Sequence, residues 1–123
     1  MNHYVANDLL QVMPEAIADL ANRVRLTILE YTPDCEEATI PAAKSIHYIL
    51  KGAKYVPGPF LTLAVTSRTI TLHFLYGDQV NDPEKLLEGY GGRQRIYRVT
   101  NVDEAQHPGL KALIESARMV RQR

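Results

Sequence analysis

The sequence has 123 residues, of which 46% are hydrophobic and 23% are charged, and this is typical of one globular domain spanning 1–123. Its formal net charge is zero, which argues against a protein that binds nucleic acid by neutralising many phosphates. The single cysteine excludes a disulfide within the chain, and no apolar run approaches the roughly 20 residues of a membrane-spanning helix. We therefore expect a cytoplasmic protein whose partner is neither nucleic acid nor a membrane.

The first predicted element is an amphipathic helix that begins at Pro14 and ends near Tyr31. Apolar residues recur there at three- and four-residue steps, as on the buried side of a helix: Ile17, Leu20, Ala21, Val24, Ile28 and Tyr31. Proline is tolerated in the first turn of a helix, and Pro33 prevents the helix from continuing. The preceding residues predict no more than a short helix over Asp8 to Met13.

The acidic stretch after this helix predicts a short helical turn that ends before Pro41. Asp34 is suited to cap that turn, which would hold Glu36, Glu37 and Ala38.

Two strands farther along form a predicted hairpin, over 60–66 and 69–76. In the second strand Ile70, Leu72 and Phe74 alternate with polar residues, which indicates an antiparallel strand with one buried face. Upstream of the hairpin, Ser45 to Leu50 fits either a strand or a helix and closes at Lys51-Gly52. A turn or extended corner is expected at 57–59, where glycine stands between two prolines.

The last third of the chain predicts a brief helix from Asp82 to Gly89, a strand over 95–100 and a turn or short helix over 103–107. Pro108 begins the final helix, whose apolar side is formed by Leu110, Leu113, Ile114, Ala117 and Val120. The simplest arrangement that buries these apolar stripes is an α+β fold. We expect an antiparallel sheet of about three to five strands with the N- and C-terminal helices packed on one face.

The pattern Asp-Pro…Leu-Leu-Glu-Gly…Gly…Arg over 82–95 is the most distinctive motif of the chain. Together with Met13-Pro14-Glu15 and its helix, the acidic stretch 31–37, the strand 69–77 and the helix 110–117, it resembles the YdhG-like family of small bacterial domains. Most members of that family have no assigned function. The resemblance covers roughly residues 13–118.

The resemblance implies an α+β fold in which helices pack on one antiparallel sheet. One family member is described as a frataxin-like iron chaperone, so weakly bound iron and an iron-acceptor protein are implied as cofactor and partner. The chain departs from the family pattern over 39–48, where an aromatic-Gly-x-Pro-x-Tyr element is usual and this sequence has neither tryptophan nor glycine. His47 and Tyr48 stand in that place, where they could line a pocket of different shape.

Asp34, Glu36 and Glu37 form the first candidate site, with Glu30 one turn earlier. Their carboxylates are hard oxygen ligands that suit iron in a weak, open site, as a chaperone that must release its metal requires. The alternative is a helix cap followed by a solvated acidic turn, which the positive end of a helix stabilises. No histidine at metal-ligand spacing accompanies these residues, which favours the second interpretation.

The second candidate site is a glycine–arginine loop with one strand histidine: Gly91, Gly92, Arg93, Arg95 and His73. Glycine lets backbone N–H groups approach an anion, and arginine can bind carboxylate or phosphate through two hydrogen bonds. The loop lacks the lysine of a P-loop and the spacing of a dinucleotide fingerprint. The alternative is a tight turn whose arginines pair with Glu84 or Glu88, and a sheet histidine without a chemical role.

No set of nucleophile, base and orienting residue can be assembled from the spacing, so we do not expect an enzyme. Cys35 has acidic neighbours, and negative charge raises the pKa of a thiol, so it is not predicted as a nucleophile. The sequence thus predicts a small binding domain. It is either an iron-binding, chaperone-like protein, or a domain for a small anion or phosphate-bearing ligand, or an interaction module that could form a homodimer.

Overall fold

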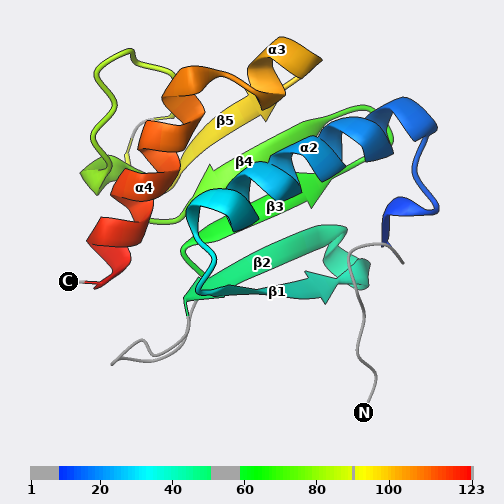
Figure 1. Cartoon of the computed structure of the whole chain (residues 1–123), viewed down its shortest axis with the longest axis horizontal. Helices are drawn as coiled ribbons and strands as arrows, with labels where there is room; N and C mark the ends of the chain where they lie inside the picture. The colour runs from blue at the N-terminus through cyan, green and yellow to red at the C-terminus, as the bar shows by residue number, and fades with distance from the viewer. Residues whose placement is uncertain (1–8, 51–58, 90, 123) are drawn as a thin grey trace.

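A five-stranded antiparallel sheet lies at the centre of the computed structural model, which describes residues 9–50, 59–89 and 91–122 (Figure 1). The strands are β1 (Cys35–Ile40), β2 (Ser45–Leu50), β3 (Leu61–Val65), β4 (Ile70–Phe74) and β5 (Arg95–Val99). They lie side by side in chain order, and each is antiparallel to its neighbours. The predicted α+β class and the expected number of strands are confirmed.

The alternating sequence of β4 determines which face of the sheet is buried. Ile70, Leu72 and Phe74 are at most 1% exposed and lie opposite equally buried apolar residues of β3. Complete burial of one such side chain contributes about 1.5–3 kcal/mol. The hairpin turns without glycine because the Thr66 hydroxyl accepts hydrogen bonds from the backbone N–H groups of Arg68 and Thr69.

Two long helices cover this face of the sheet, α2 (Glu15–Tyr31) and α4 (Pro108–Gln122), and the short α3 (Val102–Ala105) precedes α4 (Figure 1). The helices pack against each other as well as against the sheet. Their buried apolar residues include Ala21, Val24, Ile28, Leu110, Leu113, Ile114 and Ala117. The prediction that both helices lie on one face is therefore confirmed. None of the helices in the described ranges combines the length and apolar character that crossing a bilayer demands.

The acidic stretch is a strand, so the predicted helical turn is wrong. β1 pairs with β2 along its whole length, from Cys35 opposite Leu50 to Ile40 opposite Ser45. The 3-10 turn η1 (Pro41–Ala43) and Lys44, whose φ is 51°, reverse the chain between the two strands. Pairing with β2 supplies hydrogen-bond partners for the backbone of β1. These hydrogen bonds outweigh the preference of acidic residues for the start of a helix.

The predicted helix over Asp82 to Gly89 is also wrong. The two carboxylate oxygens of Asp82 accept hydrogen bonds from the N–H groups of Leu86 and Leu87, each at 2.9 Å. Lys85 has a φ of 56°, in the left-handed region. A side chain that binds backbone N–H groups competes with helical hydrogen bonding, and a left-handed residue interrupts a helix.

Several shorter predictions can be placed on the structure. Ser45 to Leu50 is a strand, the 95–100 segment contains β5, and the 103–107 segment overlaps α3. Of the short helix predicted over Asp8 to Met13, Leu9 and Leu10 are helical and buried. Residues 1–8, the predicted closure at 51–52 and the 57–58 part of the predicted corner lie outside the described residues.

Candidate functional site

The predicted metal ligands lie on a strand, where neighbouring side chains point to opposite faces. Glu37 lies opposite Tyr48 on the helix-covered face of β1, and Glu36 is exposed on the other face. Asp34 precedes the strand and receives a hydrogen bond from Arg118 of α4 at 2.7 Å. No three His, Cys, Asp or Glu side chains within the described ranges are arranged to hold a metal ion. Iron binding by these residues stays a prediction, without a converging set of ligands.

Glu37 belongs to a hydrogen-bond network that joins α2 to the sheet. Arg25 donates to its two carboxylate oxygens from Nε at 2.8 Å and from Nη2 at 2.9 Å, and Tyr48 donates its hydroxyl at 2.8 Å. Arg25 also donates to Asn22 at 2.7 Å. Burial disfavours the charged carboxylate, but the hydrogen bonds from Arg25 and Tyr48 outweigh burial and lower the pKa of Glu37. Both carboxylate oxygens of Glu37 therefore already have hydrogen-bond partners, which connect α2 to β1 and β2.

The glycine–arginine loop is folded around Arg95. Gly91 and Gly92 have φ values of 68° and 58°, so both adopt the left-handed conformation that glycine permits. Arg95 Nη1 donates to the carbonyl oxygens of Gly91, Gly92 and Gln94 at 3.2, 3.3 and 2.8 Å. The guanidinium of Arg95 is therefore bound to carbonyl oxygens of its own loop, and these hydrogen bonds stabilise the loop.

The other members of the second candidate site lie around this loop without forming one pocket. The exposed Arg93 has its guanidinium 6.0 Å from the centre of the Tyr76 ring. His73 Nδ1 lies 3.2 Å from Gln94 Oε1 on the face of the sheet that the helices leave uncovered. Glu88 pairs with Arg98, so the expected pairing of Glu88 with Arg93 or Arg95 is not observed. Anion binding by this loop stays a prediction.

His47 and Tyr48 point to opposite faces of β2. Tyr48 is completely buried on the helix-covered face, and its hydroxyl is bound to Glu37. His47 is half-buried on the uncovered face, where it lies opposite Thr62 of β3, which in turn lies opposite His73 of β4. The two residues therefore do not line a common pocket.

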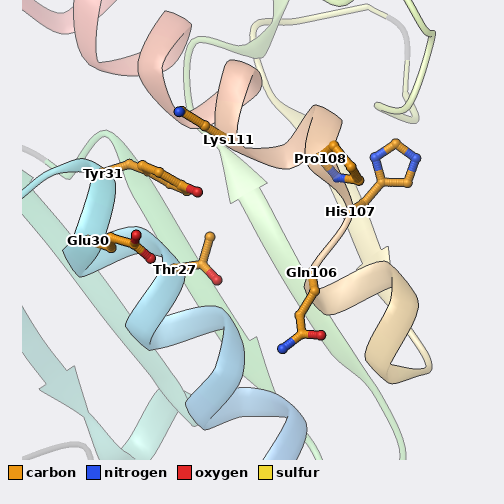
Figure 2. Close-up of a pocket in the computed structure, with 7 residues that line it drawn as sticks. All are labelled: Thr27, Glu30, Tyr31, Gln106, His107, Pro108 and Lys111. Atoms are coloured by element: carbon orange, nitrogen blue, oxygen red, sulfur yellow. The ribbon is translucent and has the colours of Figure 1, made fainter.

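A hollow of about 380 Å³ lies between the C-terminal half of α2 and the start of α4 (Figure 2). Its lining comes from α2, from the connection between α3 and α4, and from the first turn of α4: Thr27, Glu30, Tyr31, Gln106, His107, Pro108 and Lys111. Most of these side chains are polar. The hollow therefore differs from a gap in the core and has the groups of a binding site for a polar molecule.

Local sequence positions each wall of this hollow. Thr27, Glu30 and Tyr31 are three and four residues apart, so they share one side of α2. On the other wall, His107 Nδ1 accepts a hydrogen bond from the N–H of Gly109 at 2.9 Å, which caps the first turn of α4. This cap fixes where α4 begins and thereby the position of Lys111.

Glu30 and Lys111 bring opposite charges to opposite walls. Figure 2 shows Glu30 and Tyr31 projecting from α2 and Lys111 projecting from α4. The Lys111 ammonium lies 5.0 Å from the centre of the Tyr31 ring, within the range of a cation–π interaction. Neither charged group forms an ion pair with another residue of the described part of the chain. A carboxylate and an ammonium are thus available to a ligand in the same hollow.

Sequence reasoning missed this site because its two walls are distant in the chain. The segments 27–31 and 106–111 come together only when α2 and α4 pack on the same face of the sheet. In the sequence, Glu30 and Lys111 look like the solvated side of an amphipathic helix, Tyr31 belongs to the predicted apolar stripe, and Gln106 and His107 fall in the predicted turn or short helix over 103–107. Only Glu30 was singled out in the sequence, as a neighbour of the acidic stretch.

Comparisons with protein-family models, with curated proteins and with solved structures found no match to this chain. The resemblance to the YdhG-like family, and the iron-handling role that it implies, therefore stay predictions.

Proposed function

We propose that the protein is a non-catalytic binding domain for a ligand that carries a carboxylate beside an N–H group. Free α-amino acids and the carboxyl ends of peptides both have this chemistry. The proposal is carried by one observation: Glu30 and Lys111 face the same hollow from opposite walls, and neither forms an ion pair within the described residues.

The hollow offers complementary partners for both ligand groups. A carboxylate accepts charge-assisted hydrogen bonds from the Lys111 ammonium, and the Tyr31 hydroxyl and the Gln106 amide are further donors in the lining. The ligand N–H donates to the Glu30 carboxylate. A volume of about 380 Å³ is at the small end of the range for ligand pockets, about 300–1,000 Å³, which favours a small group.

The proposed ligand still belongs to the predicted class of small anions, but its site is the hollow between α2 and α4 and not the glycine–arginine loop. The glycine–arginine loop is the weaker candidate because Arg95 is already bound by three carbonyl groups of its own loop. The iron-handling role is the weaker alternative because Asp34 and Glu37 are each bound by an arginine. No observation on the described residues favours a homodimer over a monomer.

The test is a titration of ¹⁵N-labelled protein with N-acetylalanine, which carries a carboxylate beside an amide N–H. We expect concentration-dependent shifts of the backbone amide signals confined to 27–31 and 106–111. The matched ligand N-acetylalanine amide lacks the carboxylate and is expected to leave the spectrum unchanged. Equal shifts with both ligands, or shifts outside these segments, contradict the proposal.

A pair of variants separates a specific ammonium from general positive charge. Lys111→Ala is expected to abolish the shifts, because it removes the cation of the hollow. Arg68→Ala removes an exposed cation from the β3–β4 turn, distant from the hollow in sequence and on another element, and is expected to leave binding unchanged. Loss of binding in both variants would indicate only a dependence on net charge.

A further inference from the structure

A second hollow, of about 310 Å³, lies between the N-terminal half of α2 and the start of α3. Ala16, Asp19, Leu20 and Arg23 line it from α2, and Asn101 and Val102 line it from the other side. Its floor is apolar, because Leu20 packs against the core and Val102 lies beside the hollow with 42% of its surface exposed. An exposed valine beside a half-buried leucine is suited to an aliphatic side chain.

The two hollows use the same side of α2. Their α2 residues follow one another at three- and four-residue steps from Ala16 to Tyr31, so they form one stripe along the helix. The Thr27 hydroxyl donates to the Arg23 carbonyl oxygen at 2.9 Å, which joins the last α2 residue of one hollow to the first of the other. The two hollows therefore follow each other along α2.

The opposite walls of the two hollows come from neighbouring segments of the chain. The second hollow is bounded by Val102, the first residue of α3, and the first hollow begins at Gln106, directly after α3 ends. α2 packs against both α3 and α4 (Figure 1). The two hollows, together called the groove below, lie in line along α2: one is polar with opposite charges beside α4, and the other has an apolar floor beside α3.

We propose that this groove binds the carboxyl end of an extended peptide, with an aliphatic side chain in the apolar part. This inference rests on the proposed function and narrows its ligand. Leu20 precedes Glu30 by ten residues, which is a rise of about 15 Å along the helix. An extended chain advances about 3.3 Å per residue, so about four residues separate the terminal residue, whose N–H binds Glu30, from the residue with the aliphatic side chain.

Charge complementarity supports a peptide over a free amino acid or a plain aliphatic acid. Asp19 and Arg23, one helical turn apart, place an acceptor and a donor along the apolar part, where backbone N–H and C=O groups of a peptide require both. A free amino acid reaches only the charged part. An aliphatic tail would leave Asp19 and Arg23 without polar partners from the ligand.

The test uses N-acetylated serine hexapeptides in which one leucine is moved from the terminal position backward, with calorimetry as the readout. We expect the affinity to be highest when leucine stands four residues before the carboxyl end, about tenfold above the all-serine peptide. Amidation of the carboxyl end is expected to remove binding. Affinity that is independent of the position of leucine overturns the inference.

Two variants locate the leucine contact. Val102→Asp is expected to remove the gain from leucine and to leave the affinity for the all-serine peptide unchanged. Met119→Asp alters another exposed apolar residue, eight positions beyond Lys111 on α4, and is expected to change neither affinity. Equal losses in both variants overturn the inference.

The outcomes separate the two proposals. If N-acetylalanine and the all-serine peptide bind through Lys111 but leucine adds nothing at any position, the proposed function stands and the extended peptide is excluded. If neither probe binds, both proposals are wrong.

Discussion

Replacing Arg25 with methionine is expected to lower the free energy of unfolding by about 2–3 kcal/mol at pH 7. The substitution keeps an unbranched apolar stem and removes the N–H groups that bind Glu37 at 2.8 and 2.9 Å. Loss of one partner costs about 3–5 kcal/mol in a fully buried pair, whereas an exposed pair contributes about 0–1 kcal/mol. The side chains of Arg25 and Glu37 are 20% and 18% exposed, so an intermediate loss is expected.

The pH dependence of this loss has a definite sign. The pKa of Glu37 is lowered in the folded protein, because the hydrogen bonds from Arg25 and Tyr48 outweigh the opposing effect of burial. A carboxyl group of this kind adds stability above its unfolded pKa, and that stability is lost as the pH falls through the folded pKa. The difference between the wild type and Arg25→Met is therefore expected to be largest at neutral pH and to shrink below about pH 4.

Urea unfolding followed by circular dichroism at pH 7 and pH 3.5 measures both effects. Arg98→Met is the matched control, because it removes an ion pair of nearly the same length, 2.9 Å, whose side chains are 54% and 55% exposed. That variant is expected to lose less than about 1 kcal/mol. Equal losses in the two variants at pH 7 would show that burial does not set the strength of the Arg25 pair. A deficit of Arg25→Met that is unchanged at pH 3.5 would show that the loss does not depend on the charge of Glu37.

Three further outcomes are expected. Gly77→Ala should lower the thermal midpoint, because an added Cβ would lie 2.5 Å from Arg95 Cβ and 2.8 Å from the Arg95 backbone nitrogen; an unchanged midpoint in calorimetry contradicts this. His107→Ala should lose about 1 kcal/mol in chemical unfolding with the α4 cap, whereas His107→Asn, which can also cap, should lose less. Burial raises the pKa of the Cys35 thiol against the effect of its Thr32 hydrogen bond, so the native protein should react with a thiol reagent at pH 8 only after unfolding; rapid reaction of the folded protein contradicts this.

Local patterns in the sequence were sufficient to predict the elements that bury most of the core. The alternation of Ile70, Leu72 and Phe74 identified β4 and its buried face, and the apolar stripe of α2 identified the side that packs on the sheet. The acidic stretch was predicted wrongly because its structure depends on a partner. Glu36 and Glu37 are on a strand because β2 lies beside them, and the sequence of β2 was itself compatible with a helix.

The candidate sites were less predictable than the fold, for a related reason. Sequence reasoning grouped residues that are neighbours in the chain, and the structure shows that such neighbours are divided between faces or bound to their own loop. Glu37 is bound by Arg25, twelve positions earlier, and Arg95 is bound by carbonyl groups of the segment that precedes it. Glu30 and Lys111 share a hollow although they lie on the first and last long helices of the described chain. No local motif records such a juxtaposition.

The order of the strands has a consequence for kinetics. Every strand is paired with its neighbour in the sequence, so each pairing closes only the connection between two consecutive strands, which is typical of faster-folding chains. α2 and α4 precede and follow the sheet in the chain, so the hollow between them is complete only after the strands have paired. Interactions that form late in folding act mainly on the unfolding rate. A ligand held between α2 and α4 is therefore expected to prolong the lifetime of the folded protein while leaving its rate of folding nearly unchanged.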